Sequence, residues 1–136
     1  SMGGYVVKQL VKKLIAAGKN ILHSNVLIMG ATFKENVSDI RNSKVSDVYH
    51  ELISYGLNVD VVDPYASSEE LQEEYGFGLT LTPDDNYDAV ILAVAHDDYT
   101  SLDENYFKTI TGPDAILIDL KGIYRKDIKD LTYWSL

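Results

Sequence analysis

The first periodic segment of the chain covers residues 5–17. Its apolar residues recur at helical spacing, and three lysines fall on the opposite side: Val6, Val7, Leu10, Val11, Leu14 and Ile15 against Lys8, Lys12 and Lys13. Gly18 follows, and glycine commonly ends a helix. The spacing predicts an amphipathic helix, and the width of its apolar side indicates that it packs against more protein.

Short, mainly apolar runs occur at four later places, and each predicts a strand. They cover residues 25–30, 57–62, 89–94 and 115–119, with a weaker candidate at 79–81. The run at 25–30 is apolar without alternation, which is typical of a parallel strand covered on both faces. Between them lie a polar stretch at 31–42 and segments predicted as helices at 43–55, from Ser67 or Ser68 to about Tyr75, and around 103–110.

This alternation of strands and helices predicts the fold class. Strand–helix–strand units in one sheet take right-handed crossovers and give parallel strands. We expect an α/β fold, a Rossmann-like three-layer sandwich with a mostly parallel sheet, preceded by the end of a long linker helix.

Composition narrows the class of protein. With 136 residues, 46% hydrophobic and 24% charged, the chain fits one ordinary globular domain. It has neither an apolar run long enough for a membrane helix nor a signal peptide, so we expect a cytoplasmic protein without membrane contact. The lack of cysteine excludes a disulfide, a thiolate metal site and a cysteine nucleophile within the chain. Ser1 before Met2 is interpreted as a tag remnant.

The net charge of −9 is unevenly distributed. Residues 45–107 contain 15 acidic and no basic residues, whereas residues 1–44 carry seven basic and two acidic ones and residues 108–136 carry five and four. The overall charge argues against nucleic-acid binding. A phosphate-bearing ligand would be handled by the first third of the chain or by its tail, although an acidic middle that only confers solubility explains the charges equally well.

The loop at residues 31–42 is the main candidate site, because ligands of such sheets bind beyond the carboxyl ends of the strands. Gly30 is its only glycine, so the glycine-rich cradle of a dinucleotide site is absent. The loop offers Phe33 as a stacking surface and Lys34 and Arg41 as cations. The alternative is that Lys34 is only solvated and Arg41 is paired with Asp39 or another carboxylate.

Three further polar residues follow strands. Asp63 lies where a Rossmann fold places its ribose-binding acid, but an Asp-Pro turn explains it equally well. His96 could act as a base or contact a ligand. It has no nucleophile or metal cluster beside it, however, and a hydrogen-bonding role in its loop is favoured. Lys121 could bind a phosphate or could be simply exposed.

The segment GATFKENVSDIRNSKVSDV, residues 30–48, resembles the UDP-glucose/GDP-mannose dehydrogenase family at the start of its C-terminal domain. It is most similar to the branch that oxidises UDP-N-acetylhexosamines to the uronic acids of bacterial polysaccharides. Val62-Asp63-Pro64, the run ending at His96, and Asp119-Leu120-Lys121-Gly122 match in the same order. Residues 2–6 resemble the late part of the family's central helix.

The resemblance implies specific roles. Residues 23–136 would form the UDP-sugar-binding C-terminal domain, and residues 1–22 the end of the central linker and dimerisation helix. Phe33, Lys34 and Lys121 would bind UDP, and Arg41 would reach the pyrophosphate of NAD. The implied partners are the UDP-sugar, the rest of the enzyme chain and a second copy that pairs through the central helix.

The family oxidises a primary alcohol to the carboxylate in two hydride transfers to NAD, through a cysteine-bound thioester. Because this chain has no cysteine and no G-x-G-x-x-G loop, we expect no catalytic residue, no metal site and no activity from it alone, and we expect NAD to be bound mainly by an N-terminal domain. Two alternatives stay open: a freestanding Rossmann-type nucleotide-binding or regulatory module, and an oligomerisation domain.

Overall fold

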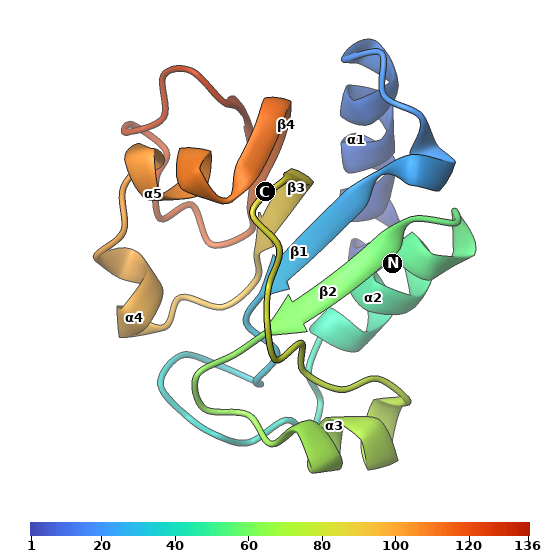
Figure 1. Ribbon diagram of the computed structural model, residues 1–136. Coiled ribbons are helices and arrows are strands. Elements are labelled where there is room, and N and C mark those ends of the chain that lie inside the picture. Colours follow the sequence, from blue (N-terminus) through green and yellow to red (C-terminus); the bar gives the residue numbers. More distant parts are fainter.

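One five-stranded sheet forms the centre of the molecule, and the computed structural model describes all of residues 1–136 (Figure 1). The strand order is β2-β1-β3-β4-β5, and every neighbouring pair is parallel. The strands are β1 (Asn25–Met29), β2 (Asn58–Val62), β3 (Tyr87–Leu92), β4 (Thr111–Asp119) and β5 (Thr132–Ser135). The predicted Rossmann-like α/β class is confirmed, and the sheet is wholly parallel.

Helices cover both faces of the sheet, which gives the three layers predicted (Figure 1). Helices α1 (Met2–Ala16) and α2 (Val45–Ser54) lie on one face, and α4 (Asp97–Thr100) and α5 (Glu104–Thr109) lie on the other. Helix α3 (Ser68–Tyr75) follows β2, and a short 3-10 turn, η1 (Ile21–His23), leads from α1 into β1. No helix has the length and apolar character that crossing a membrane requires.

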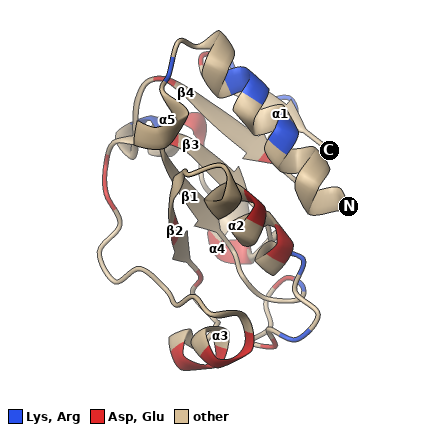
Figure 2. Cartoon of the chain, turned by 90° about the vertical axis from the view of Figure 1, so that its right-hand side faces the viewer, with Lys and Arg blue, Asp and Glu red and all other residues tan.

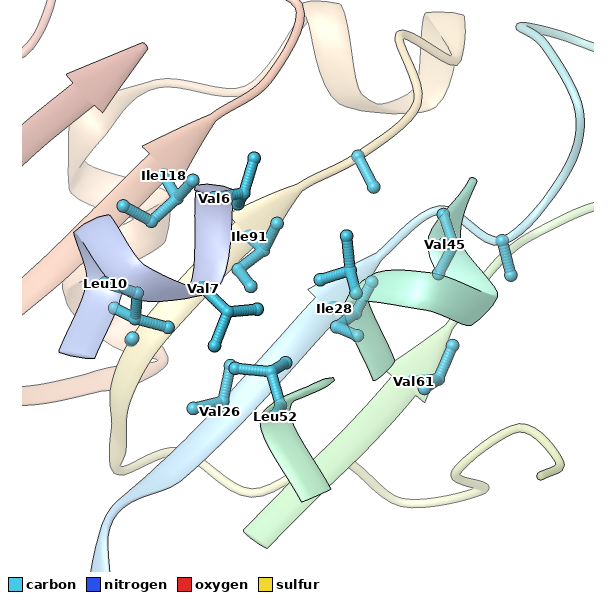
Figure 3. Packing of buried hydrophobic residues seen from close by; sticks show 14 of the residues in the cluster. Val6, Val7, Leu10, Val26, Ile28, Val45, Leu52, Val61, Ile91 and Ile118 are labelled. Atoms are coloured by element: carbon cyan, nitrogen blue, oxygen red, sulfur yellow. The ribbon is translucent and has the colours of Figure 1, made fainter. Parts of the chain in front are cut away.

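Two hydrophobic clusters fill the spaces between the layers. Residues of the strands alternate between them, because successive side chains of a strand point to opposite faces. Val26, Ile28, Ile91 and Ile118 pack against Val6, Val7, Leu10, Val45 and Leu52 of α1 and α2 (Figure 3). On the other face, Leu27, Val90 and Leu117 pack with Tyr99 and Phe107. Central strands buried on both faces explain why the sequence shows bare apolar runs.

Helix α1 is part of the larger cluster. It begins at Met2, earlier than predicted, because the side chain of Ser1 accepts a hydrogen bond from the Gly4 N–H and caps the first turn. The predicted apolar side is correct for the four residues that are buried, namely Val6, Val7, Leu10 and Leu14. It is wrong for Ile15, which is 61% exposed.

The predicted strand at 79–81 does not form. The Thr80 N–H donates to the carbonyl of Val61 over 2.8 Å, but the Val61 N–H donates to the side-chain oxygen of Thr80 instead of a backbone carbonyl. The Thr80 side chain therefore accepts the bond that a backbone carbonyl would accept in a β-ladder. Leu81 beyond it is 96% exposed and cannot anchor a buried strand.

Two elements were not predicted from the sequence, α4 and the edge strand β5. Strand β5 has four residues, Thr-Tyr-Trp-Ser, none of them fully buried. It pairs with β4 from Ile116–Thr132 to Asp119–Ser135 and closes the sheet on that side.

Candidate functional site

A cavity of about 260 Å³ opens at the carboxyl edge of the sheet, on the side of α1 and α2. The loop after β1 provides one wall and the residues after β3 and β4 provide others. Its lining residues are Met2, Thr32, Phe33, Lys34, Lys44, Val45, Val48, Ala93, Val94, Leu120, Lys121 and Leu136. The lining is mostly apolar with a few polar groups, which is usual for a small-molecule site.

The structure brings the three residues predicted to bind UDP together around this cavity. Phe33 and Lys34 come from the loop after β1, and Lys121 comes from the turn after β4. Phe33 is 54% exposed although it is a large aromatic residue. An exposed aromatic face beside lysines is suited to a base and its phosphates.

A third lysine, Lys44, also lines the cavity and was not predicted. It directly precedes α2, at the N-cap position of that helix. The sequence does carry one signal for Lys44. Ser43 is the predicted cap of the helix that follows the main loop, and a cation directly after it lies at the ligand-facing edge of the sheet. The direction of its side chain depends on how the start of α2 packs beside the end of β3.

The electrostatic character of the cavity differs from that of the rest of the chain. No Asp or Glu lines it, although the chain carries a net charge of −9. The ammonium groups of Lys34, Lys44 and Lys121 form no salt bridge, so none of the three is neutralised by a carboxylate. Acidic residues gather elsewhere, prominently on α3 (Figure 2). The cavity is therefore the place where this acidic protein can accept an anion.

Hydrogen bonds to its backbone carbonyls give the loop after β1 a closed shape. The Phe33 N–H donates to the carbonyl of Asp39 over 2.7 Å, and the Thr32 hydroxyl donates to the carbonyl of Lys34 over 2.8 Å. At the far end, the hydroxyl of Tyr75 on α3 donates to the carbonyl of Ile40 over 2.5 Å. These bonds hold the loop without using the side chains of Phe33 or Lys34.

Gly30 lets the end of β1 approach the end of β3. Its φ is +106°, and a Cβ at this position would lie 2.7 Å from the Cβ of Val94. Only glycine fits a positive φ together with so close a neighbour. The single glycine of this loop therefore serves packing beneath the cavity.

Asp63 is fully engaged in hydrogen bonds. Its Oδ2 accepts from the Ala31 N–H over 2.7 Å and lies 2.9 Å from the Nε2 of His96, while its Oδ1 accepts from the backbone N–H groups of Tyr65 and Ala66. The side chains of Asp63 and His96 are both 0% exposed. Of the two interpretations of Asp63, the turn is the one that fits, and no surface is left for a ribose. His96 makes loop hydrogen bonds, as the sequence favours.

Arg41 lies apart from the cavity. Its guanidinium is bound to both carboxylate oxygens of Asp39, and its side chain is 79% exposed. This hydrogen bonding lowers the pKa of Asp39 to about 2 and raises the pKa of Arg41. The ion pair is the alternative weighed for Arg41 from the sequence; the expected contact with NAD stays a prediction.

Residues 27–126 match the model of the UDP-glucose/GDP-mannose dehydrogenase family, UDP binding domain. The matched range contains all four predicted site residues and Lys44.

Curated relatives give the same result over nearly the whole chain. It is 41% identical over 131 residues to the UDP-N-acetyl-D-glucosamine 6-dehydrogenase of Pseudomonas aeruginosa, covering 96% of this chain and 31% of the relative. It is 38% identical over 132 residues to the enzyme of the same name from Salmonella typhi, with the same two shares covered. The chain thus spans about a third of the length of these relatives.

Solved structures support the fold. The structure superimposes on the NDP-N-acetyl-D-galactosaminuronic acid dehydrogenase of Methanosarcina mazei Go1 with a TM-score of 0.83 and 21% identity, covering 98% of this chain and 29% of that one. It superimposes on the UDP-D-ManNAc dehydrogenase of Pyrococcus horikoshii with a TM-score of 0.82 and 18% identity, covering 98% and 30%. At such identities the likeness concerns the fold.

Proposed function

The chain belongs to the UDP-glucose/GDP-mannose dehydrogenase family, and from this we propose that it is the C-terminal UDP-binding domain of an NAD-dependent UDP-sugar 6-dehydrogenase. Residues 23–136 form the UDP-sugar-binding unit in this proposal, and residues 1–22 are the end of the linker helix. The UDP-sugar would be a UDP-N-acetylhexosamine, because the two relatives described above are named for one.

One observation carries the proposal: three unpaired lysines and an exposed phenylalanine share a cavity without acidic residues. A nucleoside diphosphate has a flat base and a compact group of negative charges. Phe33 offers a face on which the uracil can stack, and Lys34, Lys44 and Lys121 offer ammonium donors for the diphosphate. The apolar residues between them would exclude water from the ribose side of the ligand.

Arg41 has a separate role in this proposal. It does not line the cavity, and its high exposure leaves it available to a group supplied from outside the chain. We assign it to the pyrophosphate of NAD, held mainly by another domain of the intact enzyme. To make that contact, the guanidinium would leave the carboxylate of Asp39 and bind the phosphates. Both groups can accept two parallel hydrogen bonds from an arginine.

The oxidation itself would belong to the rest of the enzyme. NAD would accept the two hydrides, and the cysteine required by the family's chemistry is not in this chain. A second copy of the enzyme is proposed to pair through the central helix, of which α1 is the end. Tyr5 and Ile15 on α1 are each more than half exposed, which leaves them accessible to such a contact. The intact enzyme is proposed to be cytoplasmic.

Calorimetric titration of the chain tests the proposal. UDP should bind, uridine should bind more weakly because it lacks the diphosphate, and inorganic phosphate alone should bind more weakly than UDP. A chain that binds none of these would overturn the assignment and favour the oligomerisation alternative. The chain mixed with NAD and a UDP-N-acetylhexosamine should form no NADH, and sustained NADH formation would contradict the proposed division of roles.

A further inference from the structure

A buried imidazole connects three loops directly behind the proposed UDP site. His96 follows β3, and its ring is enclosed between the loop after β1 and the turn after β2. Its Nδ1 accepts a hydrogen bond from the backbone N–H of Asn36 over 2.9 Å. Its Nε2 lies 2.9 Å from the Oδ2 of Asp63 and 3.3 Å from the hydroxyl oxygen of Thr32. Nδ1 therefore holds the backbone of Asn36, and Nε2 contacts the side chains of Asp63 and Thr32.

These partners fix which nitrogen carries the proton. The Asn36 N–H can only donate, so Nδ1 is unprotonated and the proton lies on Nε2. That proton points to the carboxylate of Asp63, which also accepts from the Ala31 N–H. The Thr32 hydroxyl donates to the carbonyl of Lys34 and so presents a lone pair to the imidazole. Every hydrogen bond in the group is satisfied in this one tautomer.

The hydrogen bonds of His96 and Asp63 fix both ends of the segment that carries the proposed UDP contacts. Ala31 is held at one end through Asp63, and Asn36 is held at the other through His96. Asn36 has a φ of +61° and its side-chain oxygen accepts from the Asp97 N–H over 2.9 Å, so it is tied to the β3 loop a second time. Phe33 and Lys34 lie between these anchors with side chains that make no anchoring bond.

We propose that His96 and Asp63 are positioning residues for nucleotide binding. Through the single tautomer of His96 they hold residues 31–36 in the shape that presents Phe33 and Lys34 to the ligand. This rests on the proposed function, since it concerns the same UDP site. Without the imidazole, the segment gains alternative conformations, and UDP must restrict them when it binds. The free-energy cost of this restriction lowers the affinity for UDP, in addition to any loss of fold stability.

Two substitutions at His96 separate its two hydrogen bonds. The amide of His96→Gln can place its NH2 group at the position of Nε2, as a donor for Asp63, but leaves no acceptor at the position of Nδ1 for Asn36. The shorter His96→Asn can place its carbonyl oxygen at the position of Nδ1 and keep the acceptor for Asn36. We expect the UDP dissociation constant to rise about fivefold in His96→Gln, which corresponds to one lost neutral hydrogen bond, and to recover in His96→Asn. Hydrogen exchange of the Asn36 amide should be fast in His96→Gln and slow in His96→Asn and in the unaltered chain.

The measurements are made where urea unfolding shows each variant to be fully folded, so that lost stability is not mistaken for lost affinity. If His96→Gln does not fold, Asn36→Ala is used instead, because it disfavours the positive φ at the exposed residue that His96 holds. Asn36→Gly is its control, because glycine keeps the positive φ. The glycine variant should bind UDP more tightly than the alanine variant. The positioning role is overturned, while the proposed function stands, if the unaltered chain binds UDP and His96→Gln binds it equally well. The same holds for Asn36→Ala if that variant has to be used instead. If the unaltered chain binds no UDP, the proposed function fails and the positioning role fails with it.

Discussion

Arg41 donates to both carboxylate oxygens of Asp39, from Nε to Oδ1 and from Nη2 to Oδ2, over 3.0 Å in each case. The Arg41 backbone N–H donates to Oδ1 as well, over 2.9 Å. The two residues thus form a local clasp at the outer end of the loop after β1. The side-chain hydrogen bond is the largest cause of the lowered pKa of Asp39, and the backbone bond is the second.

Removing the guanidinium should return the pKa of Asp39 most of the way from about 2 toward its ordinary 3.8. A lowered folded-state pKa means that the clasp stabilises the fold above about pH 4 and that this contribution is lost as the pH falls through 2. The pKa of the Asp39 carboxyl in Arg41→Gln, followed by carbon NMR, tests this. A value that stays near 2 would mean that the backbone bond alone sustains the shift.

In the intact enzyme, Arg41→Gln tests the proposed contact with NAD. If Arg41 exchanges Asp39 for the NAD pyrophosphate, Arg41→Gln should raise the Michaelis constant for NAD roughly tenfold, because a charge-assisted bidentate contact is lost. The Michaelis constant for the UDP-sugar should change little. Steady-state kinetics with each substrate varied in turn measures both. An unchanged constant for NAD would remove Arg41 from the cofactor site.

Gly30 should not tolerate a side chain. Gly30→Ala places a Cβ 2.7 Å from the Cβ of Val94 at a φ of +106°, and we expect it to lower the free energy of unfolding by roughly 2–5 kcal/mol. Gly18→Ala is the matched control, because its φ is +76° but nothing lies within 4 Å of the new Cβ. It should cost about 1 kcal/mol. Urea unfolding of both variants makes the comparison, and equal losses would show that the contact with Val94 is easily relieved.

The apolar pattern predicted the central strands correctly for a physical reason. Strands β1 and β3 are covered on both faces, so their sequences contain almost no polar residues. The edge strand β5 was missed because it is only four residues long and half-buried. Such a strand depends on pairing with β4, a partner that local sequence does not reveal.

The candidate site was partly predictable. The position of the loop after β1 and its cations follow from the rule that ligands bind beyond the carboxyl ends of parallel strands. The cavity itself could not be predicted, because it is closed by residues far apart in the sequence. Met2 and Leu136 both line it, and Figure 2 shows the two ends of the chain close to each other. Which lysines face this space depends on that packing, and this is why Lys44 was missed.

The three lysines of the cavity should each contribute to UDP affinity. Lys34→Ala, Lys44→Ala and Lys121→Ala should each raise the UDP dissociation constant roughly tenfold, because each removes a charge-assisted hydrogen bond that is partly open to solvent. The effect should shrink at high salt, where exposed charges are screened. Isothermal titration of each variant at low and high ionic strength provides the measurement.

Two controls make the result specific to the diphosphate. Lys12→Ala removes the same charge from the outer side of α1, where no part of the cavity lies, and should leave UDP affinity unchanged. Phe33→Ala removes the proposed stacking face, so it should weaken the binding of uridine as well as UDP, whereas the lysine variants should weaken only UDP. If Lys44→Ala behaves like Lys12→Ala while Lys34→Ala and Lys121→Ala bind weakly, the diphosphate lies between the loop after β1 and the turn after β4, away from α2.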